Sequence, residues 1–588
     1  MTEQYLKYLY DNNNKYVKFD GTNYKLNSRY KIGKIQINKD LTVLEQLNGS
    51  VQKIYIQNHD LNGAYNDDIV LVQVMFNPKG KTKGKVAEVL QRGLSEILCV
   101  VKDKDLYTVK ENILIDCEYV NNKEGDIVIF QNSKIIKKLG TAQDPAVDEI
   151  ISLYLYNELS RLEPYTTTIG EATSSKERVD LTSLDFCTID PVGAKDFDDA
   201  VYFDQINSRL YVAIADVSAY IKKDSKLDKE AQKRAFSIYL PHKVLPMLPF
   251  ELSNNLCSLV PNENRLAYVF KMDLDIKNQK VSSSELFEAV INSKRRYSYE
   301  EIDTILEQND KENYFTKLFN ITTKFRKSRL KNGYDFRNEE LRQNLDENYE
   351  LTHINKEDST PSHSLIEECM LLANQEAAKR LKTLGIFRVH DEPTQAKISK
   401  LIDDVNMLGL NAKLKSDVHS TIVSIQQKAK NVGLEQEIDE LIIQSQQQAS
   451  YSHLKKEHFG LGFKDYSHFT SPIRRYADLV LHRILKTDQI PKNIEEVCTH
   501  ISEKEREIAA LVWDFEDRKY ARWANKHIGI TVNAKIVDLQ NHLAETIDDI
   551  KGARISIKNY GGEKLFTQVR LKITHSDIVS KRISAIII

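Results

Sequence analysis

Short segments in which apolar and polar residues alternate run through the first 140 residues of the chain. Clear examples are residues 51–56 (VQKIYI), 68–74 (DIVLVQV), 96–101 (EILCVV) and 126–130 (DIVIF). Asn, Gly and Asp separate these segments, as is typical of strands joined by short turns. The spacing predicts two small barrels, at residues 1–85 and 86–142. Each is long enough for an OB-type, cold-shock-like fold.

The pattern changes to mixed helix and strand after residue 141. A helix entered through Asp144-Pro145 is predicted at 143–162, and strands are predicted at 184–190 and 210–215. Longer helical patterns follow at residues 297–350, 363–384 and 396–448. We therefore expect a mixed α/β domain from 143 to 527.

Alternation returns after Gly529. Apolar residues alternate with polar ones at 530–536, and again at 569–573 after a Gly561-Gly562 turn. This predicts a short C-terminal OB-type barrel at 528–588. The predicted fold class is multidomain α+β, with β-rich OB or cold-shock-type barrels flanking a mixed α/β domain.

The composition is that of a globular chain with several cores: 588 residues, 41% apolar and 29% charged, with 12 Pro and 21 Gly. Lys and Arg (83) nearly balance Asp and Glu (85), and the net charge of −2 neither supports nor excludes a nucleic-acid partner. No apolar run approaches the ~20 residues that span a bilayer, and the N-terminal segment lacks the apolar core of a signal peptide. The six cysteines lie far apart, which favours packed thiols in a cytoplasmic protein over zinc ligation.

Residues 188–201 (TIDPVGAKDFDDAV) are the most informative window for chemistry. Asp190, Asp196, Asp198 and Asp199 lie within ten residues, between two apolar segments. Because gathered carboxylates repel one another unless water or cations relieve the charge, the window favours a metal site. Hard oxygen ligands suit Mg²⁺ or Mn²⁺, which activate water and orient a phosphodiester. An ordinary solvated Asp turn is the alternative.

A second window, residues 468–478 (HFTSPIRRYAD), predicts the start of a helix. Ser471 is a good N-cap, and Pro472 suits the first helical position. Apolar residues at helical spacing would face the core, leaving Arg474, Asp478 and His482 one turn apart on another face. Two arginines at the positive end of a helix dipole favour phosphate binding. The alternative is a surface helix whose arginines pair with Asp478.

Two aromatic residues are candidates for contact with nucleic acid. Tyr239 lies in residues 237–241 (SIYLP), and Phe387 lies in residues 385–390 (GIFRVH). Exposed aromatic rings near basic residues stack on the bases of single-stranded nucleic acid, although core packing is the commoner role of such rings. His390 is a candidate phosphate or 2′-hydroxyl contact, with a purely structural histidine as the alternative.

Taken together, these windows resemble the ribonuclease II (RNB) family, and within it the ribonuclease R group. The matching stretches are TIDPVGAKDFDDAV (188–201), YVAIADVSAYI (211–221), IYLPHKVLPMLPFELSNNLCSL (238–259), LIEECMLLAN (365–374), FRVHDEP (387–393) and HFGLGFKDYSHFTSPIRRYADLVLHR (458–483). They occur in the family's order and frame about half of the chain.

The resemblance implies a 3′→5′ exoribonuclease that hydrolyses RNA processively to 5′-mononucleotides with Mg²⁺ (or Mn²⁺). It implies a metal-binding cluster formed by Asp190, Asp196, Asp198 and Asp199. In this reading Asp198 and Arg474 are catalytic, and Arg474 neutralises the scissile phosphate. The implied RNA-binding residues are Tyr239, Phe387, His390, Ser471, Arg474, Arg475 and Tyr476. The barrels would form the entrance for single-stranded RNA, with 2′-hydroxyl contacts favouring RNA over DNA.

The expected partner is RNA with a single-stranded 3′ end, and no membrane is expected. A monomer is the default because a channel that threads RNA needs no symmetry mate; association with a helicase or the ribosome remains open. Three alternatives also stay open: a ribonuclease II-like enzyme that stalls at duplex RNA, a catalytically silent RNA-binding regulator, and a DNA nuclease. The first barrel is expected to start almost at the N-terminus, without the winged-helix segment of some relatives.

Overall fold

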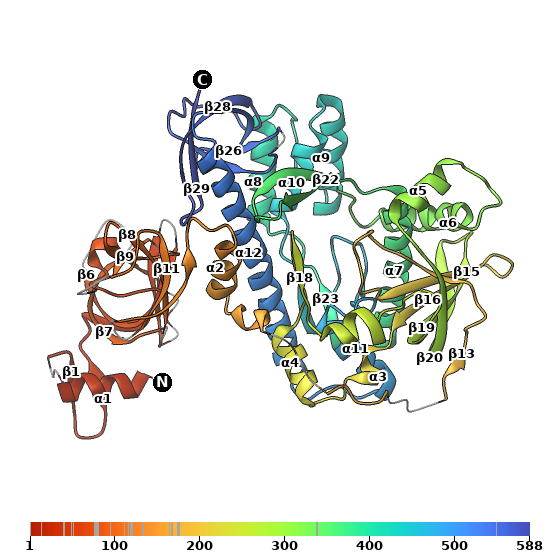
Figure 1. Ribbon diagram of the computed structural model, residues 1–588, viewed down its shortest axis with the longest axis horizontal. Coiled ribbons are helices and arrows are strands. Elements are labelled where there is room, and N and C mark those ends of the chain that lie inside the picture. The colour runs from red at the N-terminus through yellow and green to blue at the C-terminus, as the bar shows by residue number, and fades with distance from the viewer. Residues whose placement is uncertain are drawn as a thin grey trace.

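The computed structural model describes residues 2–12, 15–38, 41–48, 50, 52–75, 82–93, 96–110, 112–115, 117, 121–131, 134–163, 165, 168–172, 177–336, 339–548 and 550–588. A long helix, α12 (Ile494–Lys526), runs between the N-terminal β-rich units and a large mixed α/β region, and a C-terminal barrel lies at one end of that helix (Figure 1). The predicted fold class is confirmed. Among the described helices, none is long and apolar enough to cross a membrane.

A helix and a β-hairpin precede the first barrel. α1 (Thr2–Asn12) packs on the hairpin of β1 (Val17–Phe19) and β2 (Tyr24–Leu26), with Leu9 and Val17 in their shared core. The prediction that the barrel starts almost at the N-terminus is therefore wrong. The two strands have three residues each, too few for an alternation pattern that separates them from the barrel.

The first barrel is closed, in the strand order β3-β4-β5-β7-β6. Its elements are β3 (Tyr30–Asn38), β4 (Leu41–Gln46), β5 (Ile54–Ile56), the helical turn η1 (Asn58–Asp60), β6 (Ile69–Met75) and β7 (Lys83–Gln91). Alternate residues such as Ile35, Val70 and Val72 are fully buried in the barrel core, as the sequence pattern predicts. Because β7 continues to Gln91, the predicted boundary at residue 85 falls inside a strand.

The second unit is a five-stranded sheet in the order β10-β9-β8-β11-β12. Its strands are β8 (Ile97–Lys102), β9 (Asp105–Thr108), β10 (Leu114–Ile115), β11 (Asp126–Gln131) and β12 (Lys134–Thr141). α2 (Val147–Leu155) follows, and its Val147 and Ile151 share an apolar core with Val100 and Ile127 of the sheet. The helix predicted at 143–162 is thus α2 followed by a separate turn, η2 (Leu159–Leu162).

The mixed region is built on a six-stranded sheet in the order β13-β20-β14-β15-β16-β19. Its strands are β13 (Val179–Asp180), β14 (Phe186–Ile189), β15 (Asp199–Asp204), β16 (Arg209–Ala215), β19 (Asn264–Asp275) and β20 (Lys280–Tyr297). β20 pairs in parallel with β13 and β14, and the other pairings are antiparallel. The largest apolar core joins this sheet to the helices that pack on it.

Helices and three two-stranded sheets complete the mixed region. The helices besides α12 are α3 (Val217–Tyr220), α4 (Lys226–Arg234), the π-turn η3 (Leu252–Leu256), α5 (Tyr299–Glu307), α6 (Tyr314–Arg329), α7 (Pro361–Arg380), α8 (Gln395–Met407), α9 (Val418–Val432), α10 (Glu435–Ser445) and α11 (Tyr476–Thr487). The paired strands are β17 (Ile238–Leu240) with β18 (Lys243–Leu245), β21 (Glu340–Leu345) with β22 (Leu351–Glu357), and β23 (Leu384–Val389) with β24 (Ser450–Leu454).

The helix predicted over 297–350 is wrong beyond α6. Gly333 follows the end of α6, and β21 and β22 then form a hairpin around Asp346. The Asp346 carboxylate accepts hydrogen bonds from the backbone N–H groups of Asn348 and Glu350, at 2.9 Å each, which stabilises a turn in place of a helix. The many charged residues of this segment concealed the strand alternation.

The C-terminal barrel is closed, in the order β25-β26-β27-β29-β28. Its strands are β25 (Thr531–Asp538), β26 (Leu543–Thr546), β27 (Arg554–Ile557), β28 (Gln568–Asp577) and β29 (Arg582–Ile587). They lie within the predicted range 528–588. Tyr520, Ala521 and Ala524 of α12 belong to the same apolar core as the barrel, so the barrel is fixed to the end of the long helix.

Candidate active site

The sheet brings the four predicted aspartates to one edge. β14 ends directly before Asp190, and the neighbouring antiparallel strand β15 begins at Asp199. The end of one strand and the start of its antiparallel neighbour lie at the same edge, so the loop between them returns Asp196 and Asp198 to the position of Asp190. A sequence window with four acidic residues thus becomes one acidic loop.

Two side chains from outside the loop fix its path. The Ser258 hydroxyl accepts a hydrogen bond from Phe197 N at 3.0 Å and donates one to Lys195 O at 2.8 Å. At the other end of the loop, Arg296 of β20 donates to the carbonyl oxygen of Val192 at 2.6 Å. These contacts hold the backbone, so that the carboxylates do not need to pair with it. No sequence pattern indicated that Arg296 contacts this loop.

Asp198 is the most buried of the four carboxylates, at 4% exposure. Its Oδ1 accepts a hydrogen bond from the backbone N–H of Ile473 at 2.8 Å, and its Oδ2 lies 3.8 Å from Nε of Arg474. The Arg474 side chain is 43% exposed, and its Nη2 donates to the Ser471 hydroxyl at 3.0 Å. Arg474 therefore faces both Asp198 and open solvent.

The predicted helix start at Ser471 is wrong. Residues 471–475 form a turn, and α11 begins at Tyr476 with Arg475 at the N-cap position. The reason is that Ser471 N donates to Asp478 Oδ1 at 2.8 Å, which folds the turn back onto the helix. Arg474 is thus positioned by a turn beside the acidic loop, and its predicted alignment with Asp478 and His482 on one helix face does not form.

Full ionisation of the carboxyl groups in the acidic loop is strongly unfavourable. Burial, reinforced by the charge of Asp199, raises the pKa of Asp190 to about 8. Burial raises the pKa of Asp199 to about 6, although Arg474 and Arg475 oppose the shift. Burial also raises the pKa of Asp198 well above its ordinary value, against the charge of Arg474 and the hydrogen bond from Ile473. Raised carboxyl pKa values in one cluster mark a site that lacks sufficient positive charge.

The donor set of this loop fits a hard divalent cation. Asp190 Oδ2 and Asp198 Oδ2 are buried and have no hydrogen-bond partner among the described residues. Across the part of the chain that the structure describes, no three His, Cys, Asp or Glu side chains converge closely enough to hold an ion by themselves. Mg²⁺ is commonly bound through one or two carboxylates with water and substrate phosphate as its other ligands, whereas zinc takes three or four side chains. The loop therefore suits Mg²⁺ or Mn²⁺, not zinc.

Tyr239 of β17 lies beside the acidic loop. Its hydroxyl donates a hydrogen bond to Asp196 Oδ2 at 2.8 Å, and 44% of the residue is exposed. Two residues earlier, Ser237 N donates to the carbonyl oxygen of Arg474 at 3.1 Å, so the strand also contacts the turn that carries the arginine. A tyrosine that is exposed and yet anchored at the acidic loop can place an aromatic face next to the reacting phosphate.

Four of the predicted RNA-binding residues have side chains that are buried or already paired within the protein. Phe387 is 0% exposed in the core, because three consecutive residues of β23 are buried. His390 is held by the carbonyl oxygen of Gln447 at 2.8 Å and by Gly460 N at 2.9 Å, and burial lowers its pKa. The buried Tyr476 donates to Asp228 at 3.0 Å, and Arg475 pairs with the buried Asp478 at 2.9 Å. The structural alternative fits Phe387 and His390, whereas Arg475 pairs with Asp478 and also lines the groove described below.

A groove of about 740 Å³ opens beside Asp199 and Arg474. Its walls include polar and aromatic side chains from α5, α7, β23 and the segment before α11. Among them are Tyr299, His363, Asn374, Arg388, His458, Tyr466, His468 and Thr470. Several lie inside the motif windows described above, but neither their spacing nor their residue type indicated that they face a common groove. The lining of the groove also includes three acidic side chains, those of Glu340, Glu357 and Asp358.

Comparison with known proteins identifies the family. The model of the RNB domain matches residues 178–488, the region that contains the acidic loop and the Arg474 turn. This chain belongs to the RNB family. RNB family members are hydrolytic 3′→5′ exoribonucleases and generally depend on a divalent metal ion.

Individual RNB relatives extend the match beyond this domain. Ribonuclease R of Helicobacter pylori (strain ATCC 700392 / 26695) is 34% identical over 472 residues, which cover 76% of this chain and 72% of that protein. The apo form of Mycoplasma genitalium RNase R has a TM-score of 0.82 at 25% identity and covers 95% of this chain and 100% of its own. The same protein has been solved with ribose methylated single-stranded RNA and with double-stranded RNA. Yeast Ssd1, a pseudonuclease, shares the fold with a TM-score of 0.65 at 18% identity, over 90% of this chain and 79% of its own.

Proposed function

We propose that this RNB enzyme degrades single-stranded and structured RNA processively from the 3′ end and releases nucleoside 5′-monophosphates, with Mg²⁺ as its metal ion. One observation carries the proposal: Oδ2 of the buried Asp198 accepts no hydrogen bond and lies 3.8 Å from Nε of the half-exposed Arg474. A pseudonuclease also has this fold, so the fold alone does not decide for catalysis. The retained acidic loop and its arginine do support it.

In this proposal Mg²⁺ would bind at the loop of Asp190, Asp196, Asp198 and Asp199, with one or two of these carboxylates as direct ligands and the others acting through water, and with RNA phosphate oxygens as further ligands. When bound, the ion supplies an activated water and neutralises charge on the phosphate. Arg474, which the Ser471 hydroxyl orients, donates hydrogen bonds to the scissile phosphate and stabilises the negative charge that develops on it.

Tyr239 and the groove contribute RNA binding. The exposed ring of Tyr239 stacks on a base at the 3′ end, while its hydroxyl holds Asp196. The groove of about 740 Å³ offers Arg388 and several aromatic rings to the nucleotides that follow. Several contacts along one strand keep the RNA bound between successive cuts, which is the requirement for processive degradation. The M. genitalium complexes with single-stranded and double-stranded RNA support an RNA path in this fold.

We also propose that the enzyme acts as a monomer in the cytoplasm. The acidic loop, Arg474 and Tyr239 all come from one chain, so the site needs no second copy. Buried cysteines such as Cys187, Cys257 and Cys369 are not joined in disulfides, which suits a reducing compartment. Association with a helicase or the ribosome stays a prediction of the resemblance.

The test uses an RNA duplex with a single-stranded 3′ extension, labelled at its 5′ end and incubated with the enzyme and Mg²⁺. Asp198→Asn and an EDTA sample are the negative controls. Asp185→Asn is a matched control, because it changes an exposed aspartate just before β14. We expect metal-dependent shortening through the duplex to a very short product, with 5′-mononucleotides released.

Each other outcome contradicts a distinct part of the proposal. A stop a few nucleotides outside the duplex would exclude degradation of structured RNA and favour a ribonuclease II-like enzyme. Accumulation of many intermediate lengths at excess RNA would exclude processivity. Bound RNA without shortening, in Mg²⁺ and in Mn²⁺, would show that the fold has been retained only for binding.

A further inference from the structure

The strand that carries Tyr239 belongs to a small hairpin with little support of its own. β17 and β18 pair through three residues each, in the register Tyr239↔Val244, and are joined by Pro241 and His242. They form a separate two-stranded sheet that is not part of the main one. Isolated two-stranded hairpins are marginally stable, so the position of Tyr239 depends on contacts with the rest of the molecule. Ile238 and Leu245 anchor the strands in the main apolar core, and the turn that joins the strands makes separate polar contacts.

The tip of this hairpin is docked on α2. Nε2 of His242 lies 3.0 Å from Glu149 Oε2, and Nζ of Lys243 lies 2.5 Å from Glu149 Oε1. The His242 ring also stacks on Phe515 of α12, with ring centroids 5.4 Å apart, and makes an edge contact with Tyr349. Glu149 and His242 side chains are only 12% and 14% exposed, so their hydrogen bond is shielded from water.

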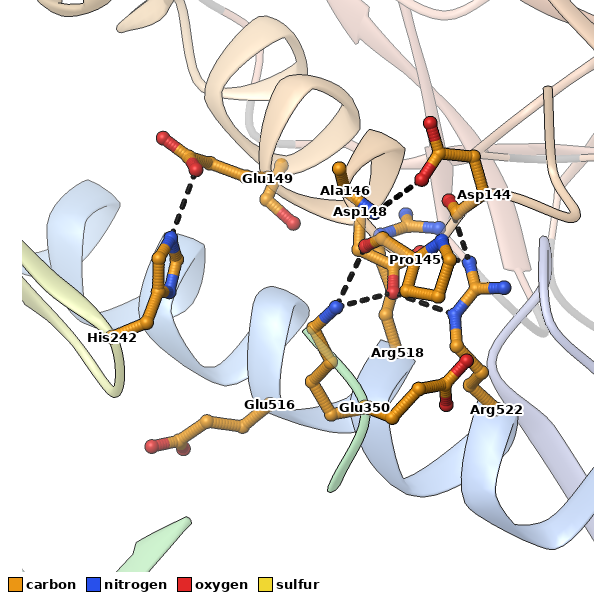
Figure 2. A network of polar contacts seen from close by, with 12 residues as sticks. Asp144, Pro145, Ala146, Asp148, Glu149, His242, Glu350, Glu516, Arg518 and Arg522 are labelled. Carbon is orange, nitrogen blue, oxygen red and sulfur yellow. Dashed lines mark hydrogen bonds and ion pairs between the residues drawn. The ribbon is translucent and has the colours of Figure 1, made fainter. Parts of the chain in front are cut away.

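Asp148, the residue before Glu149, anchors α2 on α12. Asp148 receives Lys519 at 2.9 Å and Arg522 at 2.7 Å, both from α12, and all three side chains are buried. In Figure 2, Glu149 points to His242, whereas Asp148 lies beside Arg522. The same helix packs on the second β-rich unit. α2 is therefore a common support for that unit, for α12 and for the hairpin tip.

From this arrangement we propose that Glu149 and His242 are positioning residues that hold the β17–β18 hairpin, and through it Tyr239, against Asp196. The inference rests on the RNA-binding role proposed above for Tyr239. It adds a structural link between two parts of the molecule. α2, which packs on the second β-rich unit, also fixes the position of the Tyr239 ring, which we place at the 3′ end of the RNA. Removal of the contact between Glu149 and His242 would let the hairpin move without changing any residue of the acidic loop.

The test compares Glu149→Ala, His242→Ala and Tyr239→Ala, alone and combined, on a five-nucleotide RNA and on a long single-stranded RNA. A short RNA depends on every base contact near its 3′ end, whereas a long RNA has many others. We expect Glu149→Ala and His242→Ala each to lower kcat/KM on the five-nucleotide RNA about tenfold, mainly through KM, since small displacements of a positioning group have effects of this size or larger. On long RNA the rates of these two variants should change less than about twofold, because remote contacts dominate binding there. Tyr239→Ala should lose at least as much on the short RNA and should also be slower on long RNA, because it removes the hydroxyl that holds Asp196.

Two features of the design separate positioning from general destabilisation. His242→Gln keeps a side-chain N–H that can donate to Glu149, so it should restore most of the loss seen in His242→Ala. Asp273→Asn breaks a comparable ion pair with Arg209 (2.6 Å) between β16 and β19, and should behave as wild type. Thermal melting of each variant checks that the chain still folds; the Gln variant keeps the test valid if His242→Ala unfolds.

The double variants decide between the outcomes. If Glu149 and His242 act through Tyr239, adding either change to Tyr239→Ala has no further effect. Additive losses would overturn the inference, and so would wild-type behaviour of Glu149→Ala and His242→Ala beside an impaired Tyr239→Ala. If Tyr239→Ala itself behaved as wild type, the role of Tyr239 under the proposed function would fail first, and this inference with it.

Discussion

Two regions of this molecule bury acidic side chains in opposite ways. Between α2 and α12, Asp148 accepts hydrogen bonds from Lys519 and Arg522, and no part of the three side chains is more than 3% exposed. Asp514 of α12, five residues before Lys519, is paired with Arg518 at 2.8 Å and with Lys581 of the C-terminal barrel at 2.6 Å. Although burial alone raises the pKa of Asp514, these cations hold it at about 2.

The acidic loop has no such balance. Arg474, Arg475 and Arg296 lie near the loop, but their charges do not offset burial, which raises the pKa values of Asp190, Asp198 and Asp199. A buried charge without a partner lowers the stability of the folded protein. A buried ion pair lowers it by a comparable amount only when one of its partners is removed. The comparison teaches that compensated acids join the domains, whereas uncompensated acids mark the place where an outside cation and phosphate are expected.

The largest effect expected from this comparison is on catalysis. Asp198→Asn should lower RNA hydrolysis by at least about 10³-fold, because loss of one essential charged group in a concerted site has effects of this order. It should also raise the thermal midpoint in EDTA, since an unfavourable buried charge is removed. Turnover of labelled RNA and thermal melting measure the two effects. Near-normal turnover, or a lower thermal midpoint, would contradict the contrast between the two regions.

The opposite result is expected at the α2–α12 contact. Asp148→Ala leaves Lys519 and Arg522 buried without their partner, and should destabilise the protein by about 3–5 kcal/mol. Urea denaturation followed by circular dichroism measures the loss. The control is Lys382→Ala, which breaks an exposed pair with Asp488 at 3.9 Å and should change stability by less than about 1 kcal/mol. Equal effects at both positions would refute a structural role for the buried pair.

The two regions should also differ in pH dependence. At the acidic loop the folded pKa values of Asp190 (about 8) and Asp199 (about 6) exceed the ordinary value of 3.8, so the folded state keeps protons that the unfolded chain has lost. The stability contribution of this loop in EDTA should therefore fall as pH rises from about 4 to about 8 and then level off. For Asp514 the sign is reversed: its contribution is present above 3.8 and is lost only as pH falls toward 2.

The measurement is the difference in thermal midpoint between the wild type and Asp190→Asn across this pH range. In EDTA the difference should grow in favour of the variant toward pH 8. Mg²⁺ should reduce it, because a cation that binds the ionised loop stabilises the folded state. A difference that is independent of pH, or one that Mg²⁺ leaves unchanged, would exclude an uncompensated acidic cluster.

The same comparison shows how much the sequence could predict. Asp190, Asp196, Asp198 and Asp199 are recognisable because one loop between two strands carries them all. The barrels at both ends were predicted from alternation, which depends only on neighbouring residues. By contrast, the contact between Glu149 and His242 joins residues 93 positions apart, and nothing in either local pattern indicates the other.

The wrong predictions have the same cause. Phe387 has the residue type of a stacking platform, but the packing of β23 against the core buries it. Ser471 and Pro472 have the residue types of a helix start, but a tertiary hydrogen bond to Asp478 makes a turn instead. Residue type and spacing therefore indicated which loop carries the candidate catalytic residues, whereas which face of an element meets the groove was decided by contacts distant in sequence.

The smallest effect expected is at the place where the acidic loop meets the hairpin. Tyr239→Phe removes one hydroxyl and its hydrogen bond to Asp196 but keeps the ring, so kcat should fall only by about three- to tenfold, in line with about 1 kcal/mol for such a bond. The final product should keep its length, because stacking is retained, whereas Tyr239→Ala should lengthen it. Electrophoresis of 5′-labelled RNA resolves the two. If Phe and Ala gave the same product, Tyr239 would act through its hydroxyl alone, and the ring would have no part in holding the 3′ end.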